Sequence, residues 1–259
     1  MGTGITLPSA CSGFALQGQP PAVLPATPFG QGLSFRFVLT PQVWAIGGAL
    51  AVGFDGRDAQ PLADPVEVAL AKTLGTDAYS FSITRPTFGD KGLEYVRLGR
   101  VSGPVQGVTR QYQCALGIPT LVDDLATATA VDFRRSVLLA TAQVREGAGV
   151  RAYSLGRSEI TIAGDPPARR VTLSIRLIGT PSTGADVYLG TIAASAPIDP
   201  ATGNFVAALT SPDRTVTGSI SGRFFGPQAV EIGVAFGASV AETATAPAYS
   251  VAGGVFAVR

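Results

Sequence analysis

The chain has 259 residues, with 19 basic and 18 acidic side chains, 32 glycines, 19 prolines and no histidine. The lack of histidine excludes Ser-His-Asp and Cys-His nucleophiles, the HExxH zinc helix and histidine-ligated haem. A near-neutral charge without a basic stripe argues against nucleic-acid binding. Charged residues make up only 14% of the chain, about half the usual share, and glycine, proline and small residues replace them. This composition is typical of many short strands joined by turns.

Residues 1–33 are rich in proline and small residues, as in Gln19-Pro20-Pro21, and show no hydrophobic periodicity. They predict an extended N-terminal arm laid over a domain. Beyond the arm, alternating or apolar segments recur between turn signals, which predicts a β domain over residues 34–117. Its expected strands cover 34–39, 43–54, 78–85, 93–98 and 109–116.

The segment 64–75 allows two interpretations. Asp64, Pro65 and Glu67 have the spacing of a capped helix start, and Gly75 could end that helix. The apolar residues from Val66 onward instead alternate with the period of a strand. The surrounding β pattern favours the strand, and the helix remains the alternative.

Beyond Gly117-Ile118-Pro119-Thr120, candidate strands recur about every ten residues between turn residues. They cover 127–133, 136–145, 149–155, 158–163, 169–178, 186–195, 204–210, 215–225, 230–240 and 249–258. This spacing predicts an antiparallel sandwich or barrel rather than a βαβ fold.

The residue pattern of the hairpin expected over 215–225 and 230–240 indicates which of its faces lies in the core. Alternation places Ile220 and Phe224 on the apolar face and Ser221 and Arg223 on the other. The return strand continues the apolar face, and the same pattern places Glu231 outside.

Cys11 and Cys114 are the only cysteines. An even cysteine count in a chain of extracytoplasmic character favours one disulfide between them. Such a bridge would tie the N-terminal arm to the end of the first β domain. Two buried free thiols are the alternative.

The hairpin also carries a family resemblance. Residues 218–233 (GSISGRFFGPQAVEIG) resemble the G-x-F-[FY]-G-P-x-A-x-E-[IL]-G-G signature of the transferrin-binding protein B family, although Val234 replaces its last glycine. Weaker similarities follow the family order at 93–97 (LEYVR), 112–120 (YQCALGIPT) and 131–133 (VDF). The resemblance implies an all-β fold in which an N-terminal handle-like β domain precedes a C-terminal eight-stranded antiparallel β-barrel over residues 118–259.

The same resemblance implies a non-enzymatic binding lipoprotein at the outer membrane or cell surface, or in the periplasm, of a Gram-negative bacterium. It would capture a nutrient or host protein, with a TonB-dependent outer-membrane receptor as its partner, and would reach the membrane only through a lipid anchor outside this sequence. A structural or adhesive envelope protein without a small ligand is the alternative function, and a transmembrane barrel is the alternative architecture.

No catalytic residue, metal ligand or cofactor is predicted, because the acidic side chains form no distinctive pair and no histidine is present. Aromatic residues on loops of the first β domain are natural anchors for a partner. Phe88 and Tyr95 are therefore the candidate contacts for a ligand or partner, with burial in the core as the alternative for each.

Overall fold

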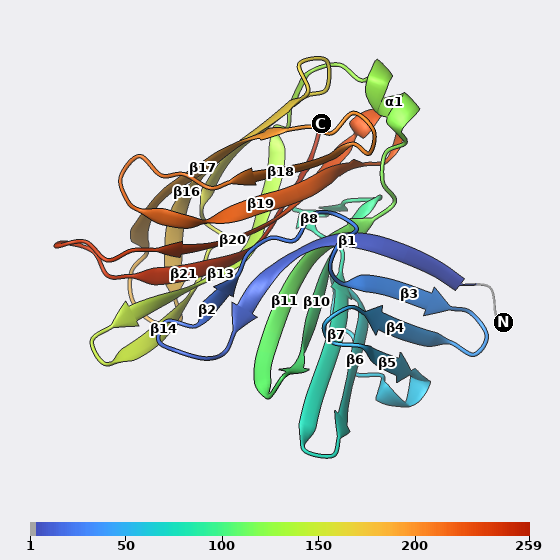
Figure 1. The fold of residues 1–259 in the computed structure, drawn as a ribbon, viewed down its shortest axis with the longest axis horizontal. Coiled ribbons are helices and arrows are strands. Elements are labelled where there is room, and N and C mark those ends of the chain that lie inside the picture. Colours follow the sequence, from blue (N-terminus) through green and yellow to red (C-terminus); the bar gives the residue numbers. More distant parts are fainter. Residues whose placement is uncertain (1–3) are drawn as a thin grey trace.

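A computed structural model describes residues 4–259, which fold into two antiparallel β units and a small hairpin. Figure 1 shows the first unit at the lower right and the second at the upper left, with β1 running along their junction. The all-β prediction is confirmed. No helix among the described residues is long and apolar enough to cross a membrane.

The first unit is a nine-stranded sheet with the order β5-β4-β3-β1-β11-β10-β7-β6, and β2 pairs with β1. Its strands are β1 (Gly4–Ala15), β2 (Ala22–Leu24), β3 (Ser34–Val38), β4 (Val43–Gly47), β5 (Val52–Asp55), β6 (Val66–Leu74), β7 (Asp77–Thr84), β10 (Val96–Val105) and β11 (Val108–Gly117). A short 3-10 turn, η1 (Gly56–Asp58), follows β5, and just beyond it Ala59 bridges to Leu70 of β6. The sheet therefore curls until its two edges approach one another.

Residues 4–33 of the expected arm are divided between the two units. Gly4–Ala15 forms a strand inside the first sheet rather than an arm over it, because β1 pairs with β3 through its first half and with β11 through its second. The following segment does lie on the second unit, where the Ala26 amide donates to Ser219 Oγ (3.0 Å) and Ser250 Oγ donates to the Pro21 carbonyl (2.8 Å).

Two further expectations of the first unit are decided by local geometry. The segment 64–75 contains strand β6, so the strand prediction is confirmed and the helix alternative is wrong. The strand expected over 43–54 is split into β4 and β5, because the chain reverses at Gly48, whose φ is +92°. A Cβ there would lie 2.6 Å from the Gly32 carbonyl oxygen, so the turn requires glycine.

The second unit is a nearly closed eight-stranded antiparallel barrel, as the motif resemblance predicts. Its strands are β13 (Arg135–Glu146), β14 (Gly149–Ser154), β15 (Glu159–Asp165), β16 (Arg170–Pro181), β17 (Val187–Pro197), β18 (Asn204–Ala208), β19 (Val216–Phe225), β20 (Glu231–Val240) and β21 (Tyr249–Val258). The strands β14 and β15 follow one another along β16 and act as one barrel strand. Bridges between Ala193 and Thr210 and between Ile198 and Phe205 close the gap between β17 and β18.

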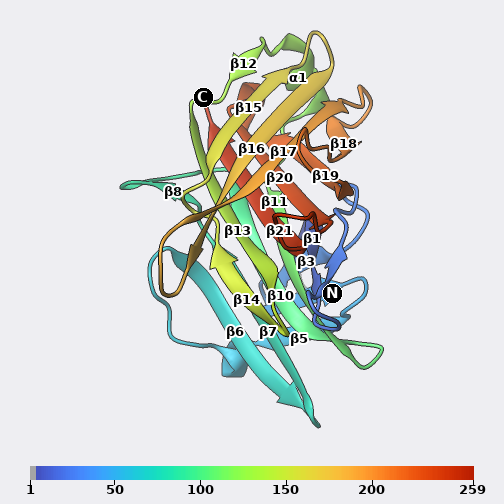
Figure 2. The ribbon, with the colours of Figure 1, turned by 90° about the vertical axis from the view of Figure 1, so that its left-hand side faces the viewer.

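The entry to the barrel differs from the expected strand over 127–133. Val122–Thr127 forms the short helix α1, and only Val131–Asp132 pairs as a strand, β12. Figure 2 shows both near one end of the barrel. A strand over the whole segment is wrong because only its last residues have a neighbouring strand, β15, to receive their hydrogen bonds.

Apolar side chains fill the barrel, and Ile220 and Phe224 lie within this core, as the alternation predicts. The predicted outer face is not in water, however, because the first unit covers part of it. A separate apolar cluster lies between the two units and includes Phe225, Ala235 and Phe256 from the barrel. Ser12 Oγ of β1 reaches across this junction and donates to the Phe236 carbonyl at 2.6 Å.

Glu231 is the clearest correction to the predicted outer face. Its side chain is only 3% exposed. Its carboxylate accepts hydrogen bonds from three consecutive backbone amides of the first unit, those of Glu94 (2.7 Å), Tyr95 (2.9 Å) and Val96 (2.9 Å). The glutamate of the motif therefore holds the two units together, which the strand period alone does not reveal.

Candidate binding surface

An apolar groove of about 350 Å³ opens at the end of the curled first sheet that lies nearest the junction. We call it the aromatic groove, and its lining residues are Ile5, Leu7, Phe37, Trp44, Glu67, Val68, Ile83, Glu94, Tyr95, Arg97, Leu116, Gly117 and Ile118. These residues come from β1, β3, β4, β6, β7, β10 and β11 and from the segments beside them. Residues far apart in the chain therefore meet here.

The aromatic floor of the groove is well ordered by packing. The rings of Phe37 and Trp44 lie 5.0 Å apart between centroids, and Trp44 lies 5.3 Å from Phe81 in the core below. Two aliphatic side chains at the rim remain largely in solvent, with Ile5 60% exposed and Ile118 61% exposed. Apolar side chains clustered at a surface concavity are typical of binding sites.

Two of the charged side chains at the rim form an ion pair and a third does not. Arg97 Nε lies 2.6 Å from Glu67 Oε2, and the Arg97 guanidinium also donates to the backbone carbonyls of Leu93, Glu94 and Val96. The Glu94 carboxylate makes no ion pair with any residue from 4 to 259. The groove thus combines an apolar floor with one unpaired negative charge.

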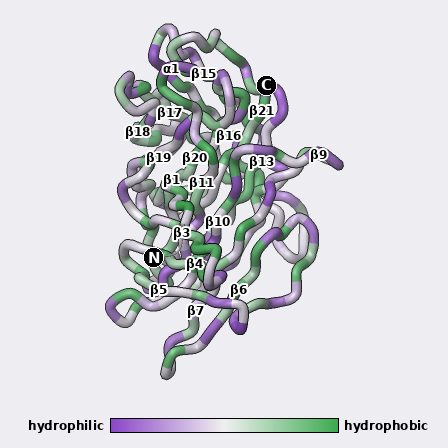
Figure 3. The backbone as a smooth tube through the Cα atoms, turned by 90° about the vertical axis from the view of Figure 1, so that its right-hand side faces the viewer, coloured by the Kyte–Doolittle hydropathy of each residue, from purple (hydrophilic) through white to green (hydrophobic). Residues whose placement is uncertain are grey.

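The two predicted contact residues lie in different places. Tyr95 lines the groove, and its ring packs on Gly226, where a Cβ would lie only 2.4 Å from Tyr95 Cδ2. Phe88 lies outside the groove, in the hairpin of β8 (Thr87–Phe88) and β9 (Lys91–Gly92), and packs against the cluster between the units. Figure 3 shows the hydrophilic end of this hairpin protruding from the molecule.

Local sequence patterns do not single out Trp44, Phe37, Ile5 or Ile118 as contact residues. The strand pattern around Phe37 and Trp44 indicates core residues, and nothing in the local pattern indicates that Ile5 or Ile118 is exposed. Trp44, the only tryptophan of the chain, could have indicated a contact site, since tryptophan is enriched at binding surfaces. No group of three His, Cys, Asp or Glu side chains within residues 4–259 is placed to hold a metal ion.

Cys11 and Cys114 are directly opposite one another on β1 and β11 and form a disulfide that is almost completely buried. The bridge lies in the core of the first unit and joins the two strands that carry Leu7 and Leu116, so the predicted pairing is the one that the structure contains.

The fold is that of transferrin-binding protein B lobes. The structure of a transferrin-binding protein B double mutant from Haemophilus parasuis Hp5 matches with a TM-score of 0.53 and 14% identity, over 97% of this chain and 44% of that chain. Intact Ap-TbpB, which comprises N and C lobes, matches with a TM-score of 0.50 and 11% identity, over 96% of this chain and 46% of that one. The chain thus spans less than half the length of these relatives. No protein-family model matches its sequence, and no curated protein does.

Proposed function

We propose that this chain is a non-enzymatic binding protein of the bacterial envelope that captures a nutrient-carrying or host protein through the aromatic groove. The observation that carries the proposal is a concave apolar surface, with Trp44 and Phe37 in its floor and exposed Ile5 and Ile118 at its rim, on a fold whose solved examples include transferrin-binding proteins. Aromatic anchors in a desolvated pocket commonly dominate the energy of protein interfaces.

The chemistry of the groove describes the partner surface that would fit it. The apolar floor suits apolar side chains of a partner, and the unpaired Glu94 carboxylate attracts a basic group next to them. We therefore expect the partner to present an apolar residue flanked by lysine or arginine. Lipid anchoring at the outer membrane or cell surface and delivery to a TonB-dependent receptor complete the proposed role.

The proposal is tested with immobilised protein and a panel of purified secreted host proteins that includes transferrin, measured by biolayer interferometry. Wild-type protein should bind at least one of them with micromolar or tighter affinity, and Ile118→Asp should weaken binding at least tenfold by placing a charge in the apolar site. Leu62→Asp is the matched control, because Leu62 is 59% exposed and does not line the groove. Equal loss in both variants, or no binding by the wild type, would contradict the proposal and favour a structural or adhesive role.

A further inference from the structure

A second groove lies on the opposite face of the first sheet. Along β7, β10 and β11 the core side chains Phe81, Val101 and Tyr112 alternate with polar ones. Because successive side chains of a strand point to opposite faces, the polar residues share the outer face. They are Ser80, Ser82, Arg100, Ser102, Gln111 and Gln113.

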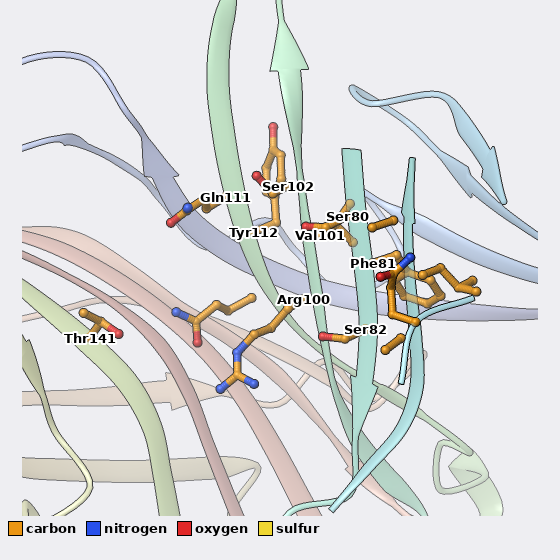
Figure 4. A pocket seen from close by; sticks show the side chains of 14 residues that line it. Ser80, Phe81, Ser82, Arg100, Val101, Ser102, Gln111, Tyr112 and Thr141 are labelled. Carbon is orange, nitrogen blue, oxygen red and sulfur yellow. The ribbon is translucent and has the colours of Figure 1, made fainter. Parts of the chain in front are cut away.

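Strand register gathers these residues around Arg100. Ser82 of β7 and Gln113 of β11 are the direct cross-strand partners of Arg100, and Ser102 lies two residues further along β10, on the same face. Thr141 of barrel strand β13 lines the same space from the other unit. The result is a groove of about 450 Å³ between sheet and barrel, into which Figure 4 shows the Arg100 guanidinium projecting.

The groove carries a positive charge that no acidic lining residue balances. Arg100 is the only charged side chain among its 14 lining residues, and it forms no hydrogen bond or ion pair within the described part of the chain. Part of the Arg100 side chain is exposed to solvent. Partial desolvation by the surrounding chain lowers the pKa of its guanidinium. The guanidinium nevertheless stays protonated at neutral pH. Beside it, the Gln113 side-chain amide donates to the Ala252 carbonyl of the barrel (3.4 Å), so it closes this end of the groove against the second unit.

We propose that this groove binds a small, hydroxyl-rich carboxylate, namely an acidic sugar. A guanidinium presents a planar fork of donors that matches a carboxylate, and no acidic residue lines the groove to compete for it. The hydroxyls of Ser82, Ser102 and Thr141 line the same groove and supply the donors and acceptors that sugar hydroxyls need. The volume is sufficient for one such molecule.

The site is independent of the aromatic groove. Ser82 lines the polar groove and its neighbour Ile83 lines the aromatic one, so the two sites lie on opposite faces of the sheet. Occupation of one does not require the other, and the proposal stands whether or not a host protein binds at the aromatic groove.

Isothermal titration calorimetry at pH 7 tests the proposal with sodium glucuronate, glucose and inorganic phosphate as probes. Wild-type protein should bind glucuronate with millimolar or tighter affinity, should not bind glucose detectably, and should bind phosphate more weakly than glucuronate. Arg100→Gln should lower the glucuronate affinity at least tenfold, and Thr141→Val should lower it several-fold. Arg134→Gln, which removes an exposed arginine outside the groove, should leave it unchanged.

Several results would overturn the proposal. These are no glucuronate binding by the wild type, equal affinity in wild type and Arg100→Gln, or phosphate binding as tight as that of glucuronate. Circular dichroism confirms that each variant is folded. Ile118→Asp should bind glucuronate like the wild type, so that failure of the aromatic groove and failure of this site are distinguishable.

Discussion

Replacing Glu231 with alanine should strongly weaken the junction between the two units. The buried carboxylate accepts three backbone hydrogen bonds, from the amides of Glu94, Tyr95 and Val96. A hydrogen bond to a charged group contributes about 1.5–3 kcal/mol. Because water can enter beside the half-exposed Tyr95 and such contributions are not additive, we expect a loss of about 4 kcal/mol.

Glu231→Gln keeps one acceptor oxygen but turns an amide group toward backbone donors, so it should cost about 2 kcal/mol. Glu242→Gln, at an exposed position, is the matched control and should cost less than about 0.5 kcal/mol. Urea unfolding measures all three variants, with fluorescence of Trp44 reporting on the first unit and far-UV circular dichroism on both.

A loss of about 4 kcal/mol would lower the urea midpoint by more than about 1 M. We also expect the two signals to separate in Glu231→Ala, because the first unit would then unfold before the barrel. A free energy of unfolding for Glu231→Ala within about 1 kcal/mol of the wild type would refute the assignment of Glu231 as the link between the units.

Three further predictions concern stability. Reduction of the disulfide, which spans 103 residues, should lower the free energy of unfolding by about 4 kcal/mol, and identical urea curves with and without reductant would contradict this. Gly226→Ala should lower the free energy of unfolding by about 2–3 kcal/mol, because its φ is +70° and its Cβ would clash with the Tyr95 ring. Gly75→Ala, with a φ of +63° and no neighbour within 4 Å, should lower it by only about 1 kcal/mol. Equal losses in the two variants would refute the clash. Burial raises the pKa of Tyr249 well above its ordinary value, so above about pH 10 the unfolded chain loses a proton that the folded one keeps, and stability falls as pH rises. The melting temperature of Tyr249→Phe should therefore fall less than that of the wild type between pH 9 and 11, and parallel curves would contradict this.

Local patterns in the sequence predicted most of the strands. The hairpin of β19 and β20 is the best case, since Ile220 and Phe224 lie in the barrel core as their alternation indicates. A period of two depends only on neighbouring residues of one strand, so it is visible without knowledge of the fold. The same property revealed β6, where alternation rather than the capping pattern at Asp64 indicated the structure.

The pattern failed where a segment owes its structure to distant partners. Gly4–Ala15 has the composition of an arm, yet it is a strand because β3 and β11 receive its hydrogen bonds. Most of the expected strand over 127–133 has no such neighbour and does not form.

The sequence by itself determined the all-β class and, through its hairpin motif, the type of barrel. Only the tertiary structure decided what lies on the outer face of that barrel, where the first unit buries Glu231. It also decided that Ile5 and Ile118 meet at one groove and that Arg100 faces Thr141 across another. The physical reason is that strand alternation records which side of a strand a residue faces, whereas the packing of one sheet on another determines what that side contacts.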